Sequence, residues 1–141
     1  MSRVSIYVNT MGRTEEQFRF YSQVFGNPVT DILYMRDVPG GPELPDEERD
    51  AVMHVEVEIL AGIILMGTDH LRSMGHQLTE GNNVSINLEP DTLEEGMRLF
   101  ESLSEGATDI VPISPMFWGA HWGVLKDRYG IRWMFNCPTP G

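Results

Sequence analysis

Hydrophobic and polar residues alternate along this chain of 141 residues in segments that predict eight strands and two helices. Within Val52–Ile59, hydrophobic and polar residues alternate from Met53 onward, which is typical of a half-buried strand. Residues 15–25 and 94–103 instead place hydrophobic residues at helical spacing. The eight expected strands are Val4–Val8, Thr30–Arg36, Val52–Ile59, Ile63–Thr68, Val84–Leu88, Thr108–Ser114, Gly119–Leu125 and Ile131–Asn136.

The pattern repeats once along the chain. Residues 5–9 (SIYVN) resemble 85–89 (SINLE), and 15–24 (EEQFRFYSQV) resemble 94–103 (EEGMRLFESL). The tripeptide TDI occurs at 30–32 and again at 108–110, so three matches in the same order have nearly the same offset. A fixed offset indicates a duplicated structural unit. We therefore expect an α+β fold of two tandem βαβββ modules, residues 1–69 and 83–137, within a single domain spanning residues 1–141.

Strand alternation also predicts two different sheet faces. One face is hydrophobic and suits a covering helix, whereas the other carries polar and aromatic side chains. A semi-polar face on a curved sheet is typical of a ligand-binding cleft, and a solvated outer face is the alternative. His121 is interpreted as the counterpart of His54 in the repeat. The candidate ligand-binding residues are Tyr7, His54, Glu56, Asn87, Trp118, His121 and Met134.

Composition limits the choice of partners. The chain has 10 Lys and Arg residues against 21 Asp and Glu residues, which gives a formal net charge of −11. Such a surface disfavours nucleic acid and anionic membranes, so a small molecule is the expected partner. The single cysteine, Cys137, cannot form an internal disulfide, and no secretion signal is apparent at the N-terminus. These features favour a cytoplasmic protein.

Five segments resemble the vicinal oxygen chelate superfamily, which includes glyoxalase I, extradiol dioxygenases and bleomycin-resistance proteins. The closer resemblance is to its PhnB-like branch, once labelled a demethylubiquinone methyltransferase domain. The resemblance implies curved mixed sheets around a cleft, the glyoxalase/bleomycin-resistance-like fold, usually in a homodimer. The segments are EEQFRFYSQVFG (15–26), VMHVEVEILAGIILMGTD (52–69), GNNVSINLE (81–89), FWGAHWGVLKDRYGIRWMFNC (117–137) and the long flap Arg36–Asp50.

Metal-using members of that superfamily place about four His, Gln or Glu ligands on the first, fourth, fifth and eighth strands. A thioether is a poor ligand for hard divalent ions, and a guanidinium is none. The usual divalent-metal site is therefore expected to be absent, and no cofactor is predicted. A displaced metal site formed by His54, Glu56 and His121 is the alternative. The residues that align with the four ligand positions are Arg3 or Ser5, Leu65 or Met66, Asn83 or Ser85, and Met134.

Three functions are consistent with these observations. The first is binding of a small molecule in the sheet cleft without the usual metal. The second is a lyase, isomerase or dioxygenase that uses a displaced metal or Glu56 with His54 as a base. The third is a structural dimer with a vestigial cleft. Methyl transfer would need an S-adenosylmethionine site, and the sequence contains none that we recognise. No catalytic residue is assigned.

Overall fold

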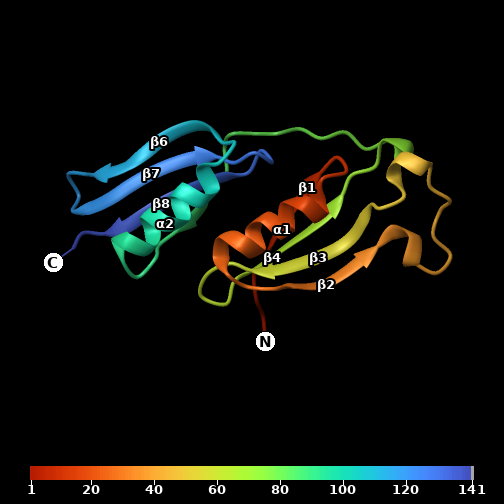
Figure 1. Cartoon of the computed structure of the whole chain (residues 1–141), viewed down its shortest axis with the longest axis horizontal. Coiled ribbons are helices and arrows are strands. Elements are labelled where there is room, and N and C mark those ends of the chain that lie inside the picture. Colours follow the sequence, from red (N-terminus) through yellow and green to blue (C-terminus); the bar gives the residue numbers. More distant parts are fainter. Residues whose placement is uncertain (141) are drawn as a thin grey trace. The chain divides into compact units, whose positions relative to one another are not determined.

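The structure is a computed structural model that describes residues 1–140, and its chain forms two compact units, Met1–Thr79 and a second unit from Glu80 onward (Figure 1). Unit 1 contains β1 (Ile6–Thr10), α1 (Thr14–Phe25), β2 (Val29–Tyr34), β3 (Val52–Glu58) and β4 (Ile64–Asp69). Unit 2 contains β5 (Ile86–Leu88), α2 (Leu93–Ser104), β6 (Thr108–Pro115), β7 (Ala120–Lys126) and β8 (Arg132–Pro138).

The two units have the same topology. The strand order is β1-β4-β3-β2 in unit 1 and β5-β8-β7-β6 in unit 2. In each sheet the first strand pairs in parallel with the last, and the other pairs are antiparallel. The predicted α+β fold of two βαβββ modules is therefore confirmed. That the two modules make a single domain stays a prediction.

One face of the sheet in unit 1 lies under α1. Phe18 and Tyr21 of this helix are fully buried, as are Val55 and Leu65 of the sheet. Gly67 of β4 has no side chain because the Phe18 ring occupies that space: a Cβ built on Gly67 would lie 2.5 Å from Phe18 Cε1. Burial of these side chains supplies the hydrophobic driving force for packing the helix on the sheet.

Asp69, buried at the end of β4, connects three elements of unit 1. Its Oδ1 atom accepts a hydrogen bond from the Thr14 backbone N–H at 3.0 Å, and its Oδ2 atom accepts one from the Val52 N–H at 2.8 Å. The Thr10 hydroxyl donates to Oδ1 at 3.3 Å. Thr14 is the first helical residue, and Arg13, which occupies the N-cap, makes no capping hydrogen bond through its side chain. The carboxylate of Asp69 supplies the missing acceptor.

Unit 2 buries Trp133 and Phe135 of β8 on the sheet face that α2 covers. The Phe100 and Phe135 rings meet edge to face, with centroids 5.3 Å apart. Asp127, buried at the β7–β8 turn, accepts from the Trp133 indole N–H at 2.8 Å and from the Tyr129 backbone N–H at 2.8 Å. The carboxylate thus fixes both the turn and the largest side chain of the core.

The repeated tripeptide TDI marks an irregularity of the same kind in both sheets. Asp31 and Asp109 have φ values of 49° and 52°, in the left-handed region. Strand pairing shifts register directly after Thr30 and directly after Thr108. Aspartate tolerates the left-handed conformation better than most residues, and such a residue accompanies many β-bulges. The repeat in sequence therefore encodes a repeated bend in the strand beside β3 and β7.

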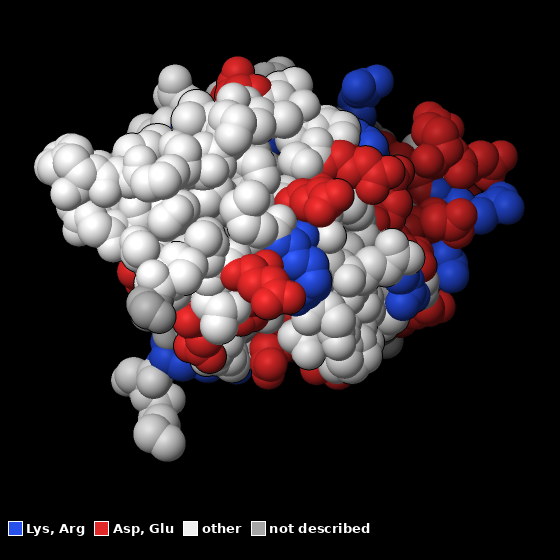
Figure 2. All heavy atoms as spheres, turned by 60° about the vertical axis from the view of Figure 1, so that its left-hand side comes forward, with Lys and Arg blue, Asp and Glu red and all other residues white. Residues whose placement is uncertain are grey.

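Two observations concern the surface. Acidic side chains outnumber basic ones on the face that Figure 2 presents, in line with the net charge of −11. Within the described residues, no helix combines the length and the apolar character that a membrane crossing requires. That the chain binds neither nucleic acid nor membranes stays a prediction.

Candidate functional site

Three of the predicted site residues form a hydrogen-bonded chain on the face of unit 1 that α1 leaves open. His54 and Glu56 lie two residues apart on β3, so both side chains point to the same face. Nε2 of His54 lies 2.7 Å from Oε2 of Glu56, and Nδ1 of His54 lies 3.2 Å from the Tyr7 hydroxyl on β1. The Tyr7 and His54 rings are tilted, with centroids 5.9 Å apart. We call these three residues the Tyr7–His54–Glu56 chain.

The chain is partly shielded from solvent. The side chains of His54 and Glu56 are 30% and 19% exposed, whereas Tyr7 is 49% exposed. Burial raises the pKa of Tyr7, and the negative charge of Glu56 raises it further. The Tyr7 hydroxyl therefore stays protonated over a wider pH range than a free tyrosine. A carboxylate, an imidazole and a phenol in series can exchange hydrogen-bond donor and acceptor roles with a bound molecule.

The open face of unit 2 holds two more of the predicted residues. Asn87 of β5 pairs with Met134 of β8, and Met134 pairs with Val124 of β7. Directly paired residues project to the same face, so these three side chains form one row across the sheet. The row is less polar than its counterpart in unit 1, because the position equivalent to Glu56 is a valine.

His121 does not belong to that row. It pairs with Cys137, which is buried beneath α2, and it lies two residues from Gly123 on the same face. Nδ1 of His121 lies 3.3 Å from the Thr139 hydroxyl. The structure therefore places His121 on the side of the sheet that carries the helix, away from Asn87 and Met134.

The equivalence of His121 with His54 is wrong by one residue. Glu56 pairs with Met66, and Met66 pairs with Tyr7; in unit 2, Val124 pairs with Met134. Val124 is thus the counterpart of Glu56, and Trp122 is the counterpart of His54. Shifting a strand by one residue moves each side chain to the opposite face. Trp122 is therefore absent from the residues predicted from the sequence, although an exact strand register would have identified it.

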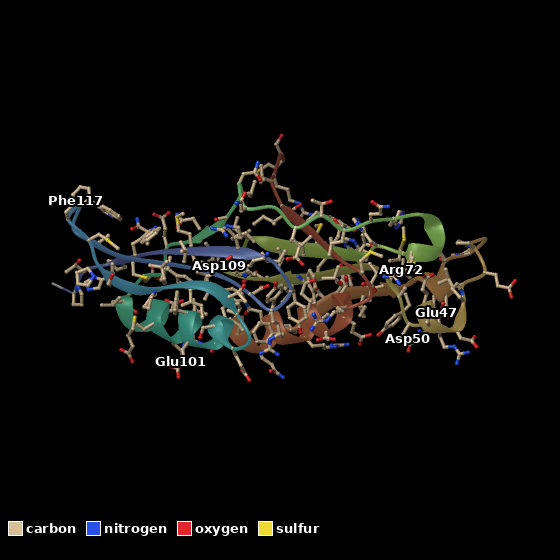
Figure 3. The ribbon with its side chains drawn as sticks, turned by 90° about the horizontal axis from the view of Figure 1, so that it is seen from above. Glu47, Asp50, Arg72, Glu101, Asp109 and Phe117 are labelled. Carbon is tan, nitrogen blue, oxygen red and sulfur yellow. The ribbon has the colours of Figure 1, made fainter. Side chains whose placement is uncertain are left out.

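Trp118 lies outside the sheet rows, in the connection between β6 and β7. It is 50% exposed, and its indole N–H points to the Asn136 side-chain oxygen at 3.5 Å. Phe117, which Figure 3 labels, packs edge to face on Trp118 with centroids 5.0 Å apart. A cleft lined by residues of both units stays a prediction, and so does the ligand-binding role of each of the seven residues.

Ser5 and Met66, two of the residues that align with metal ligands of the superfamily, are in contact in unit 1. The Ser5 hydroxyl donates a weak hydrogen bond to the Met66 sulfur at 3.8 Å. A hydroxyl with a thioether is a poor donor set for a hard divalent ion. Among residues 1–140, no three His, Cys, Asp or Glu side chains converge in a way that could hold a metal ion. His54 and Glu56 contact each other on β3, and a displaced site that also uses His121 stays an alternative.

A separate pocket of about 290 Å³ lies where the flap meets the segment after β4. Glu48 of the flap accepts a hydrogen bond from the Ser73 backbone N–H at 3.0 Å, and the hydrogen bonds from Ser73 lower the pKa of Glu48. Glu47, Asp50 and Arg72 lie around this end of unit 1 (Figure 3). The pocket contains none of the seven predicted residues.

Comparison with known proteins identifies the family. The model of the 3-demethylubiquinone-9 3-methyltransferase family matches residues 3–135. The crystal structure of protein PA1353 from Pseudomonas aeruginosa is 30% identical, with a TM-score of 0.84, and the match covers 99% of this chain and 100% of that chain.

Two further structures share the fold. A PhnB protein from Bacillus cereus is 22% identical, with a TM-score of 0.76 and coverage of 96% of this chain and 99% of that chain. A glyoxylase/bleomycin resistance protein/dioxygenase domain from Frankia sp. EAN1pec is 13% identical, with a TM-score of 0.62 and coverage of 99% and 97%. The family match and the fold agree with the resemblance seen in the sequence. The chain therefore belongs to the 3-demethylubiquinone-9 3-methyltransferase family, and it shares its fold with a PhnB protein and with a glyoxylase/bleomycin resistance protein/dioxygenase domain.

Proposed function

We propose that this protein binds a small organic molecule on the open sheet face of unit 1, without the divalent metal ion that many members of the superfamily use. The observation that carries the proposal is the Tyr7–His54–Glu56 chain, with contacts of 3.2 Å and 2.7 Å on partly buried side chains. A merely solvated sheet face has no need to align three ionisable groups. Convergent polar groups beside apolar side chains are typical of ligand sites.

The surroundings of the chain favour an organic ligand over a metal ion. Met66 lies between Tyr7 and Glu56 in the same row, and Leu33, which pairs with His54, is 43% exposed. These side chains offer an apolar surface next to the polar groups. On the open face of unit 2, taken by itself, we propose Asn87 and Met134 as ligand contacts. A homodimer in the cytoplasm is part of the same proposal.

The test is a screen of metabolite-like compounds by melting temperature, since a ligand that binds only the native state raises it. A compound that stabilises the wild type should lose its effect in Glu56→Gln and in His54→Gln. Glu58→Gln is the matched control, because Glu58 follows Glu56 on the same face of β3 and is exposed. An equal loss in Glu58→Gln would contradict the site.

The absence of the usual metal is tested separately. Protein purified without a histidine tag is analysed for bound metals by mass spectrometry. We expect substoichiometric amounts of Zn, Ni, Mn and Fe. One equivalent of any of these ions would overturn the metal-free reading and would favour the displaced site.

General acid–base catalysis is the second candidate, and the 2.7 Å contact between Glu56 and His54 favours it. A carboxylate held this close can orient an imidazole as a proton acceptor. In D₂O, such an enzyme would exchange an acidic C–H proton of its bound ligand, and Glu56→Gln would abolish the exchange. Methyl transfer, which the family's description names, is not part of the proposal, because the sequence has no recognisable S-adenosylmethionine site.

A further inference from the structure

We infer that the Tyr7 oxygen is a hydrogen-bond acceptor for the ligand, so that the site selects neutral or cationic molecules that carry a hydroxyl or amine donor on an apolar body. The inference rests on the proposed function, since it specifies the ligand class of the same open face. It follows from the order of protons along the Tyr7–His54–Glu56 chain and from the charges around it.

The proton order begins at Glu56. An ionised carboxylate only accepts hydrogen bonds, so the His54 Nε2 atom, 2.7 Å away, must carry a proton and donate it. A neutral imidazole has one N–H, which leaves Nδ1 as an acceptor. The neighbour of Nδ1 is the Tyr7 hydroxyl at 3.2 Å, and its single proton is therefore directed at His54. The Tyr7 oxygen presents only lone pairs to an incoming molecule.

The surroundings define the rest of the ligand. On β4, Met66 pairs with both Tyr7 and Glu56 and carries no charge. On β2, Leu33 pairs with His54 and is 43% exposed. Glu56 is the acidic member of the Tyr7–His54–Glu56 chain, and its negative charge repels anions. A carboxylate or phosphate ligand is disfavoured, whereas a neutral alcohol, a phenol or an amine has a donor for Tyr7 and an apolar part for Met66 and Leu33.

The first measurement needs no ligand. The ¹⁵N chemical shifts of His54 at about pH 8.5, where free histidine with a pKa of about 6.5 is neutral, report which ring nitrogen carries the proton. We expect protonated Nε2 and unprotonated Nδ1. The opposite tautomer would overturn the proton order and with it the inference. Glu56→Gln should produce a mixture of tautomers, because an amide can either accept from Nε2 or donate to it, whereas Glu58→Gln should not.

The second measurement compares phenol with anisole, which have the same ring but differ in the donor. Dissociation constants come from NMR titration of the resonances of Tyr7, Met66 and Leu33. We expect phenol to bind about two- to tenfold more tightly, the range that one net hydrogen bond provides. Tyr7→Phe should remove this preference and leave the affinity for anisole within about twofold of wild type.

The outcomes separate the two proposals. Equal affinity of the wild type for phenol and anisole, with shifts at the open face, would overturn donor selection and leave the small-molecule site standing. Benzoate binding more tightly than both would overturn the predicted charge preference. If none of these probes shifts the three resonances while a compound from the melting-temperature screen binds elsewhere, both the site and the inference are wrong.

Discussion

Replacing Asp69 by asparagine should destabilise unit 1 by about 2 to 4 kcal/mol, although the side chain keeps its size. Asp69 accepts hydrogen bonds from the buried backbone N–H groups of Thr14 and Val52, through different oxygens. Asparagine keeps one oxygen and presents an NH₂ group at the other position, so one backbone donor faces a donor. A hydrogen bond to a charged group contributes about 1.5 to 3 kcal/mol, and an unsatisfied buried group costs about 1 to 3 kcal/mol. The lost hydrogen bond and the unsatisfied N–H group are partly the same effect, so the expected total is about 2 to 4 kcal/mol rather than the full sum.

The assay is urea unfolding followed by two probes. Far-UV circular dichroism reports both units, whereas the three tryptophans, Trp118, Trp122 and Trp133, lie in unit 2. With a slope of about 2 kcal/mol per M, the unit 1 transition should move to lower urea by about 1 to 2 M. The transition seen by tryptophan fluorescence shows how much the same substitution changes the urea midpoint of unit 2.

Asp31→Asn is the matched control for this experiment. It makes the same chemical change in the same unit, at an exposed position whose left-handed conformation asparagine also tolerates. We expect a change within about 0.5 kcal/mol. If Asp69→Asn shifts the transition no further than Asp31→Asn, the carboxylate does not connect α1, β3 and β4 energetically, and the reasoning is refuted.

Three further predictions concern packing, backbone strain and charge. Gly96→Ala should destabilise unit 2 by about 1 to 3 kcal/mol in urea unfolding, because the new Cβ would overlap the Cys137 sulfur. Adding Cys137→Ala should restore most of the lost stability, and a double variant that is no more stable than Gly96→Ala would contradict this packing. Asp109→Ala should lower the free energy of unfolding of unit 2 by about 1 kcal/mol, measured by urea unfolding with tryptophan fluorescence, whereas Asp109→Gly should not. Equal effects of the two substitutions would argue that position 109 does not require the left-handed conformation. Glu56→Gln should lower the pKa of Tyr7, measured from its ring ¹³C shift, because it removes a charge that raises this pKa while the burial remains; an unchanged or higher value would refute the electrostatic coupling.

Alternation in the sequence identified the open face of unit 1 because polar residues mark it. In β3 the buried Val55 and Val57 alternate with His54 and Glu56, so the register has one solution. The same reasoning failed in β7. There the open face carries Trp122 and Val124, and the buried face carries a glycine, Gly123, against Ile113. Hydrophobicity does not distinguish these two faces, and the expected strand was placed one residue early.

The sequence places the N-terminus of α1 within one residue, but the group that caps this helix could not be predicted. Its cap is not a local signal, since the acceptor for the Thr14 N–H is a carboxylate 55 residues further along the chain. In α2 the capping group is local: the Thr92 hydroxyl accepts from the Glu95 N–H at 3.1 Å. A pattern within one segment can predict a local cap such as Thr92. The cap of α1 depends on the tertiary fold, because Asp69 lies far along the chain.

The corrected register shows how the two modules have diverged. Tyr7 corresponds to Asn87, and a methionine, Met66 or Met134, occupies the centre of the open face in each unit. Glu56 corresponds to Val124, so the module that keeps the carboxylate is also the module with the hydrogen-bonded tyrosine. Duplication preserved the bulges, the strand order and the covering helix in both units. The central row of the open face therefore keeps its methionine in both units, whereas the ionisable groups on which the proposed ligand recognition depends lie in unit 1.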